Sequence, residues 1–116
     1  MGTAADIALE RVGQWTVARI AGELDMGNCP HVREELTRTV GDDTDGLVVE
    51  LSETVYLDSA AIELLFELAR RLGRRRQQLR IVMPDDSPLR RVLELTDVRA
   101  VAPVHPSLET ALGTPA

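Results

Sequence analysis

The chain has 116 residues, of which 44% are apolar, and these values indicate one domain with its own hydrophobic core. The formal net charge of −6 argues against a nucleic-acid-binding protein, because such proteins neutralise phosphates with a surplus of Lys and Arg. No apolar run approaches the roughly 20 residues of a membrane span, and the N-terminal sequence MGTAADIALE lacks the pattern of a signal peptide. We therefore expect a cytoplasmic domain with protein partners.

The first third of the chain combines two extended runs with one helical pattern. The runs IALER and WTVARIAG are separated by residues 12–14, which predict a β-hairpin with Gly13 in its turn. The loop GELDMGNCP follows, with Asn28 as a candidate helix cap and Pro30 in the first helical turn. Residues 29–40 are predicted to form an amphipathic helix. Its apolar face carries Cys29, Val32, Leu36 and Val40, and the single cysteine is expected to be buried rather than to bind a metal.

Strand-like and helical patterns alternate along the rest of the chain. LVVEL at 47–51 is a continuous apolar run, typical of a strand that is covered on both faces. A long helical pattern then begins near Ser59. The further elements that we expect are a strand at 79–83, a helix at 87–95 with Pro88 in its first turn, a weak strand near 99–102 and a short helix at 107–112. This order predicts an α/β domain with a mainly parallel sheet, and the tail GTPA at 113–116 is expected to be disordered.

The helix that begins near Ser59 has two distinct faces. At about 100° per residue, the predicted inward arc carries Ala61, Leu64, Leu65, Leu68, Ala69 and Leu72. The opposite arc carries Ser59, Glu63, Glu67 and Arg70, with Ile62 and Phe66 at its edge. We therefore expect Ser59, Ile62, Glu63 and Phe66 to form a small mixed patch that a protein partner could use.

Two interpretations of the pair Asp58-Ser59 are open at this point. Asp and Ser are both frequent helix caps, so the pair can be explained by capping alone. A serine in the first turn is also a suitable phosphorylation site, because the helix dipole and the free N–H groups favour an added negative charge.

Two segments read together carry a family resemblance. GELD at 22–25 stands between a predicted strand and an amphipathic helix, and LSETVYLDSAAIELL at 51–65 joins an apolar run to the central helix. In order and spacing these segments resemble the two signature regions of STAS domains, in particular those of the anti-sigma factor antagonists. The resemblance runs from about residue 5 to residue 112. It implies a single α/β domain with a mixed central sheet of four to five strands and about four helices.

The resemblance also implies a function and a set of site residues. Ser59 matches the serine that an anti-sigma factor with kinase activity phosphorylates, and Asp58 matches the aspartate before it. Asp25 corresponds to the aspartate of the family's GELD loop, which contributes to the partner surface. The implied protein is not an enzyme. It has no cofactor or metal of its own, and it binds an anti-sigma factor kinase when unphosphorylated, with a serine phosphatase as a further partner.

The chain departs from the family pattern at two positions. Ala60 stands where the family has a second Ser or Thr, and Ala61 stands where it usually has Gly. These changes keep a second interpretation open: a STAS accessory module that binds a protein complex or a small ligand without phosphorylation, for example in a transport system.

Other features predict less. The basic segment RRLGRRRQQLR is expected to be a solvated helix end, with contact to an acidic partner as the alternative, and His31 is expected to be an exposed first-turn histidine. The surroundings of Ser59 also lack the nucleophile elbow of a hydrolase.

Overall fold

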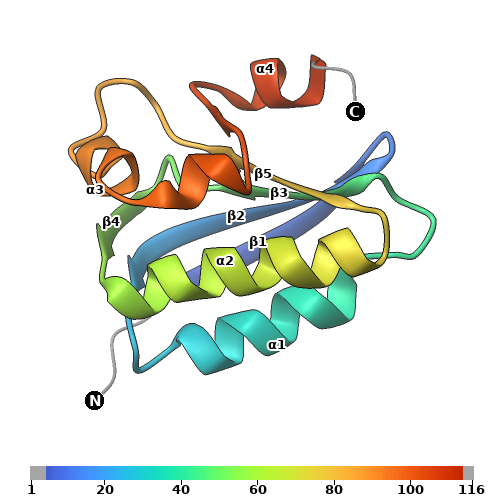
Figure 1. Cartoon of the computed structure of the whole chain (residues 1–116), viewed down its shortest axis with the longest axis horizontal. Coiled ribbons are helices and arrows are strands. Elements are labelled where there is room, and N and C mark those ends of the chain that lie inside the picture. Colours follow the sequence, from blue (N-terminus) through green and yellow to red (C-terminus); the bar gives the residue numbers. More distant parts are fainter. Residues whose placement is uncertain (1–4, 114–116) are drawn as a thin grey trace.

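The computed structural model describes residues 5–113 as six strands, four α-helices and one 3-10 helix. Figure 1 shows their arrangement. In chain order the elements are β1 Ala5–Val12, β2 Trp15–Leu24, α1 Cys29–Thr39, β3 Gly46–Glu50, β4 Thr54–Leu57, α2 Ser59–Arg74, β5 Gln78–Val82, α3 Arg90–Glu94, η1 Asp97–Ala100, β6 Val104–His105 and α4 Leu108–Gly113.

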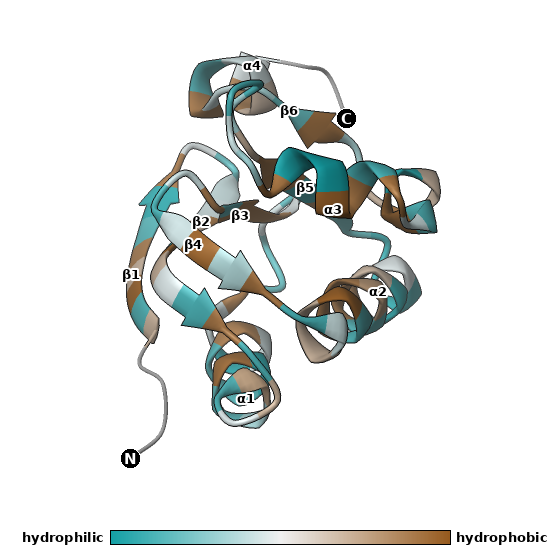
Figure 2. Cartoon of the chain, turned by 90° about the vertical axis from the view of Figure 1, so that its left-hand side faces the viewer, coloured by the Kyte–Doolittle hydropathy of each residue, from teal (hydrophilic) through white to brown (hydrophobic). Residues whose placement is uncertain are grey.

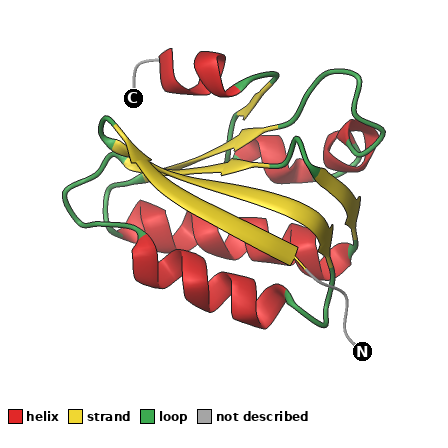
Figure 3. Cartoon of the chain, turned by 180° about the vertical axis from the view of Figure 1, so that it is seen from behind, coloured by secondary structure: helices red, strands yellow, loops and turns green. Residues whose placement is uncertain are grey.

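The sheet is mixed, as expected. Its strand order is β1-β2-β3-β5-β6, and β4 pairs with β2 beyond the end of β3. Only the β1–β2 hairpin is antiparallel; the other described pairs are parallel. Helices α1 and α2 lie together on one face of the sheet, and α4 lies on the other (Figures 1 and 3). The predicted fold class is confirmed, with one strand more than the expected four to five.

The core follows from the alternation of side chains along the central strands. On β3, Leu47 and Val49 face the larger cluster beneath α1 and α2, whereas Val48 faces a smaller cluster beneath α4. Both faces of this strand are buried, which is why the sequence shows a continuous apolar run there. Helix α3 and η1 add Leu93 and Val98 to the larger cluster.

The predicted facing of α2 is confirmed. Its buried residues are Ala61, Leu64, Leu65, Leu68 and Leu72. Ser59, Glu63 and Arg70 are exposed, and Ile62 and Phe66 are half-buried at the edge of the inward face. The helix therefore presents its N-terminal outer side to solvent, as the patch described from the sequence requires.

Two predictions in the C-terminal quarter were wrong. The segment predicted as a strand at 99–102 overlaps η1, and the short strand β6 comes later, at Val104–His105. Buried Val98 and Ala102 are four residues apart, and the N–H of Ala102 donates to the carbonyl of Val98 at 2.9 Å, which is a helical relation. The helix predicted at 87–95 is also shorter, because residues before Arg90 form a turn.

Helix α4 ends at Gly113, the first residue of the predicted tail. Residues 114–116 of that tail lie outside the described residues. Within 5–113, every helix is too short or too polar to cross a bilayer.

Candidate functional site

The two segments that carry the family resemblance meet at one edge of the sheet. Strands β2 and β4 run parallel with Leu24 paired to Leu57, and the N–H of Asp58 donates to the carbonyl of Leu24 at 3.3 Å. Because the carboxyl ends of parallel strands point the same way, the loop after β2 lies beside the start of α2. Figure 2 views the molecule from this end.

Gly22 makes this pairing possible. Strand β2 continues through the GEL part of the GELD segment, where a loop was expected, and bulges between Gly22 and Glu23. The φ angle of Gly22 is +102°, a conformation that costs glycine little and other residues much more. Its N–H donates to the carbonyl of Glu53 at 3.1 Å, so the bulge joins β2 to the turn before β4.

The carboxylate of Asp58 connects both segments. Its Oδ1 accepts a hydrogen bond from the N–H of Ala61 at 3.2 Å and caps α2. Its Oδ2 accepts a hydrogen bond from the N–H of Met26 at 3.0 Å and fixes the loop after β2. One side chain therefore sets the position of that loop relative to the helix.

Asp25 stabilises the loop after β2 through hydrogen bonds within that loop. Its Oδ1 accepts hydrogen bonds from the N–H groups of Gly27 at 2.9 Å and Asn28 at 3.2 Å. The side chain of Asn28 bonds to the N–H of Asp25 at 3.1 Å and the carbonyl of Glu23 at 2.7 Å, and it does not cap α1. Asn28 thus occupies the cap position, as predicted, but its side chain stabilises the loop instead.

Ser59 is the first residue of α2 and is exposed. Among residues 5–113 its hydroxyl has no hydrogen-bond partner, and the cap of α2 is provided by Asp58. Capping therefore explains the aspartate of the Asp-Ser pair but leaves the serine hydroxyl without a structural role.

A groove of about 470 Å³ runs past Ser59, between α2 and residues 92–96, which span the end of α3 and the turn before η1. It is lined by Leu57, Asp58, Ser59, Ile62, Glu63, Phe66, Val92, Leu95 and Thr96. Five of the six residues predicted to contact a partner line this groove, and the sixth, Asp25, lies in the adjoining loop.

Sequence reasoning missed the other wall of the groove. Val92 and Leu95 come from a segment about thirty residues after Ser59 in the chain, and Leu95 is 73% exposed. Their spacing of three places both on one side of a helical turn. The spacing of Val92 and Leu95 could have indicated an apolar side on this turn. The sequence does not show, however, that the turn packs beside α2.

A smaller hollow of about 150 Å³ lies on the other side of the α2 N-terminus, between α1 and α2. Cys29 lines it and is buried, as predicted. Burial, and to a lesser degree the negative charges of Asp58 and Asp25, raise the pKa of the Cys29 thiol to about 11. The thiol is therefore neutral at pH 7 and is a poor nucleophile.

The two positions that depart from the family pattern lie on the inner side of α2. Ala61 is completely buried, and Ala60 is half-buried against the core. The methyl group of Ala61 points inward, as predicted, so this substitution does not alter the surface around Ser59. His31 is exposed in the first turn of α1, as predicted from the sequence.

A metal site would need a cluster of the described acidic, histidine and cysteine side chains, and a histidine-dependent catalytic site would need a histidine in the groove. Neither histidine lines the groove beside Ser59. Residues 5–113 contain no group of three or more His, Cys, Asp or Glu side chains that could hold a metal ion. The geometry is that of a shallow apolar groove with an acidic and hydroxyl rim, which suits contact with another protein.

The family model of the STAS domain matches residues 6–111. The chain belongs to the STAS domain family. An anti-sigma factor antagonist from Mycobacterium paratuberculosis is similar in structure, with a TM-score of 0.82 and 26% sequence identity, over 94% of this chain and 92% of that one. No curated protein matches the chain.

Two further solved structures share the STAS fold. SpoIIAA in its unphosphorylated form gives a TM-score of 0.74 at 18% identity, over 92% of this chain and 93% of that one. The Bacillus cell fate determinant SpoIIAA in its phosphorylated form gives a TM-score of 0.68 at 19% identity, over 92% of this chain and 96% of that one. The fold of this STAS domain is thus the one found in these anti-sigma factor antagonists.

Proposed function

We propose that this STAS domain is an anti-sigma factor antagonist that switches partners through Ser59. The unphosphorylated chain binds an anti-sigma factor that is also a serine kinase, and thereby frees a sigma factor for transcription. Phosphorylation of Ser59 releases the kinase, and a serine phosphatase restores the binding form. The observation that carries this proposal is an exposed serine hydroxyl without a structural role, on the rim of an apolar groove.

The position of Ser59 suits a reversible modification. A kinase can reach an exposed hydroxyl at the start of a helix without unfolding the chain, and the first-turn N–H groups accommodate the added phosphate. Since the cap is provided by Asp58, modification of Ser59 leaves that hydrogen bond in place. The fold is therefore expected to persist in both states.

Charge explains how the phosphate would break a complex. Asp58 and Glu63 line the groove with Ser59, and neither Lys nor Arg is among its lining residues. A phosphate adds about −1.5 to −2 charges to this acidic rim. One like-charge contact with a partner at about 4 Å is unfavourable by on the order of 4 kcal/mol at an effective dielectric near 20, before screening. About 1.4 kcal/mol, which is a third of that energy, is enough to weaken binding about tenfold.

The apolar side chains of the groove would supply most of the affinity. Ile62 and Phe66 are half-buried on α2, and Leu95 stands opposite them. A partner's apolar side chain in this groove would remove them from water while Ser59 and Glu63 remain at the rim. Asp25 would act by holding the loop after β2 in place.

Two substitutions of Ser59 test the switch. We expect Ser59→Asp to keep the melting temperature but weaken binding to the cognate anti-sigma factor by about tenfold or more, as measured by calorimetric titration. Ser59→Ala should keep the binding and abolish incorporation of labelled phosphate from ATP by the kinase. Ser52→Asp is the matched control, because Ser52 is an exposed serine that does not line the groove. Undiminished binding by a folded Ser59→Asp protein, or phosphate on another residue, contradicts the proposal.

Two further variants test the groove itself. We expect Phe66→Ala to weaken anti-sigma binding more than it lowers the free energy of unfolding, whereas Leu95→Ala should weaken binding with almost no effect on folding. Val55→Ala is the control, because Val55 is 70% exposed, against 73% for Leu95, but lies outside the groove. Equal affinity of the wild type and both groove variants would remove the groove from the interface.

The phosphorylation-independent accessory module remains the alternative function. It would use the same groove without modification of Ser59. Phosphate incorporation distinguishes the two proposals: a module of this kind binds its partner but gives no phosphorylated Ser59 with any co-encoded kinase.

A further inference from the structure

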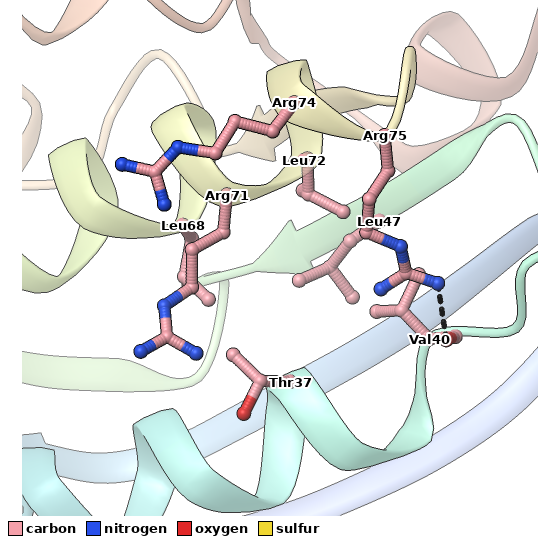
Figure 4. A pocket seen from close by; sticks show the side chains of 8 residues that line it. All are labelled: Thr37, Val40, Leu47, Leu68, Arg71, Leu72, Arg74 and Arg75. Atoms are coloured by element: carbon pink, nitrogen blue, oxygen red, sulfur yellow. Dashed lines mark hydrogen bonds between the residues drawn. The ribbon is translucent and has the colours of Figure 1, made fainter.

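A second hollow lies at the other end of α2 and plays no part in the proposed switch. It has a volume of about 280 Å³ and opens between the C-terminal halves of α1 and α2 (Figure 4). Its lining residues are Thr37, Val40, Leu47, Leu68, Arg71, Leu72, Arg74 and Arg75. Since α2 has 16 residues and rises about 1.5 Å per residue, the hollow lies roughly 20 Å from Ser59.

The floor of the hollow is apolar. Val40, Leu47, Leu68 and Leu72 form it, and each is at least nine-tenths buried in the core. Thr37 from α1 stands on one side and the arginine side chains from the α2 end stand on the other (Figure 4). Water gains few hydrogen bonds on such a floor, so the floor favours an apolar ligand body.

The rim is positively charged, and its charges are only partly matched. Arg71 pairs with Glu67 at 3.2 Å, and Arg75 pairs with Asp42. Arg74 has no ion-pair partner among residues 5–113, and no carboxylate lines the hollow. Because Glu67 also pairs with Arg33 at 3.5 Å, at least one positive charge is left for a ligand.

Arginines at the end of α2 also offset the negative end of the helix dipole. The dipole accounts for cations in the last turn, but it does not require them to surround an apolar hollow. The combination of an apolar floor with one unmatched guanidinium is the feature that selects a ligand.

We propose that this hollow binds a small amphipathic monoanion of the medium-chain carboxylic acid class. The alkyl chain lies on the leucine and valine floor, and the carboxylate accepts hydrogen bonds from Arg74 at the rim. The volume fits a ligand of about ten non-hydrogen atoms, and such ligands bind with dissociation constants of about 0.1–1 mM. This site is independent of Ser59 and of the proposed partner switch.

The test is a titration of the ¹⁵N-labelled chain with octanoate, followed by backbone amide shifts. We expect saturable shifts that centre on Thr37, Val40 and Leu72. 1-Octanol, which has the same chain without the charge, and acetate, which has the charge without the chain, should each bind at least about tenfold more weakly. No saturable shifts, equal binding of 1-octanol, or shifts confined to the groove beside Ser59 would overturn the proposal.

A pair of arginine variants locates the charge. Arg74→Gln should weaken octanoate binding about threefold to tenfold, because it removes the unmatched guanidinium. Arg70→Gln is the matched control, since Arg70 is an exposed arginine of the same helix that does not line the hollow. Equal weakening by both variants would show that only net charge matters and would overturn the assignment of this site.

Discussion

The double role of Asp58 gives a prediction that separates capping from signalling. Asp58→Ala removes the helix cap to Ala61 and the hydrogen bond to Met26. Loss of a cap costs about 1 kcal/mol, and loss of a partly exposed hydrogen bond to a carboxylate costs about 0.5–1.5 kcal/mol. We therefore expect the free energy of unfolding to fall by about 1.5–2.5 kcal/mol. For a domain of this size, that change lowers the melting temperature by about 5–15 °C.

Ser59→Ala is the decisive comparison. The hydroxyl of Ser59 has no hydrogen-bond partner among residues 5–113, and alanine is the better helix former, so this change should alter stability by less than about 0.5 kcal/mol. Asp58→Asn should fall between the two, because asparagine still caps the helix but offers no second acceptor to Met26. Chemical denaturation at equilibrium measures all three. If Ser59→Ala is as destabilising as Asp58→Ala, the serine has a structural role and the reasoning fails.

The remaining predictions concern the core. Leu65 is 1% exposed, so Leu65→Ala should destabilise the fold by about 2–5 kcal/mol in a denaturant melt, and a loss under about 1 kcal/mol would contradict the helix facing. Cys29 has its ordinary pKa of 9.0 raised to about 11, so the unfolded chain loses this proton first as the pH rises. The stability that the buried thiol contributes is therefore complete below pH 9 and lost by pH 11. The Cys29→Ala variant should lack this part of the pH dependence, and identical profiles would contradict it.

Local sequence patterns were sufficient for most of the fold. The helical repeat of Leu64, Leu65, Leu68 and Leu72 predicted which side of α2 is buried, and the alternating and continuous apolar runs predicted β2, β3 and β5. These elements could be predicted because burial imposes one period along a helix and another along a strand. The resemblance of two short segments predicted the family.

Strand β4 could not be predicted in this way. Val55 and Tyr56 are consecutive and both exposed, so the segment shows no strand alternation. It becomes a strand because β2 bulges at Gly22 and extends past the end of β3, which leaves backbone groups free for a second parallel partner. Only the three-dimensional course of β2 creates that opportunity.

The candidate site, like the fold, could be predicted only in part from the sequence. The sequence by itself determined that Ser59 begins an amphipathic helix and that Ile62, Glu63 and Phe66 share its outer side, since helix geometry fixes these relations within a few residues. Only the tertiary structure decided that Asp58 takes the cap and that the serine hydroxyl has no partner among residues 5–113. It also decided that Leu95 closes the groove from a distant part of the chain. Such contacts depend on how whole helices and strands pack against one another, and no periodic pattern in the sequence indicates them.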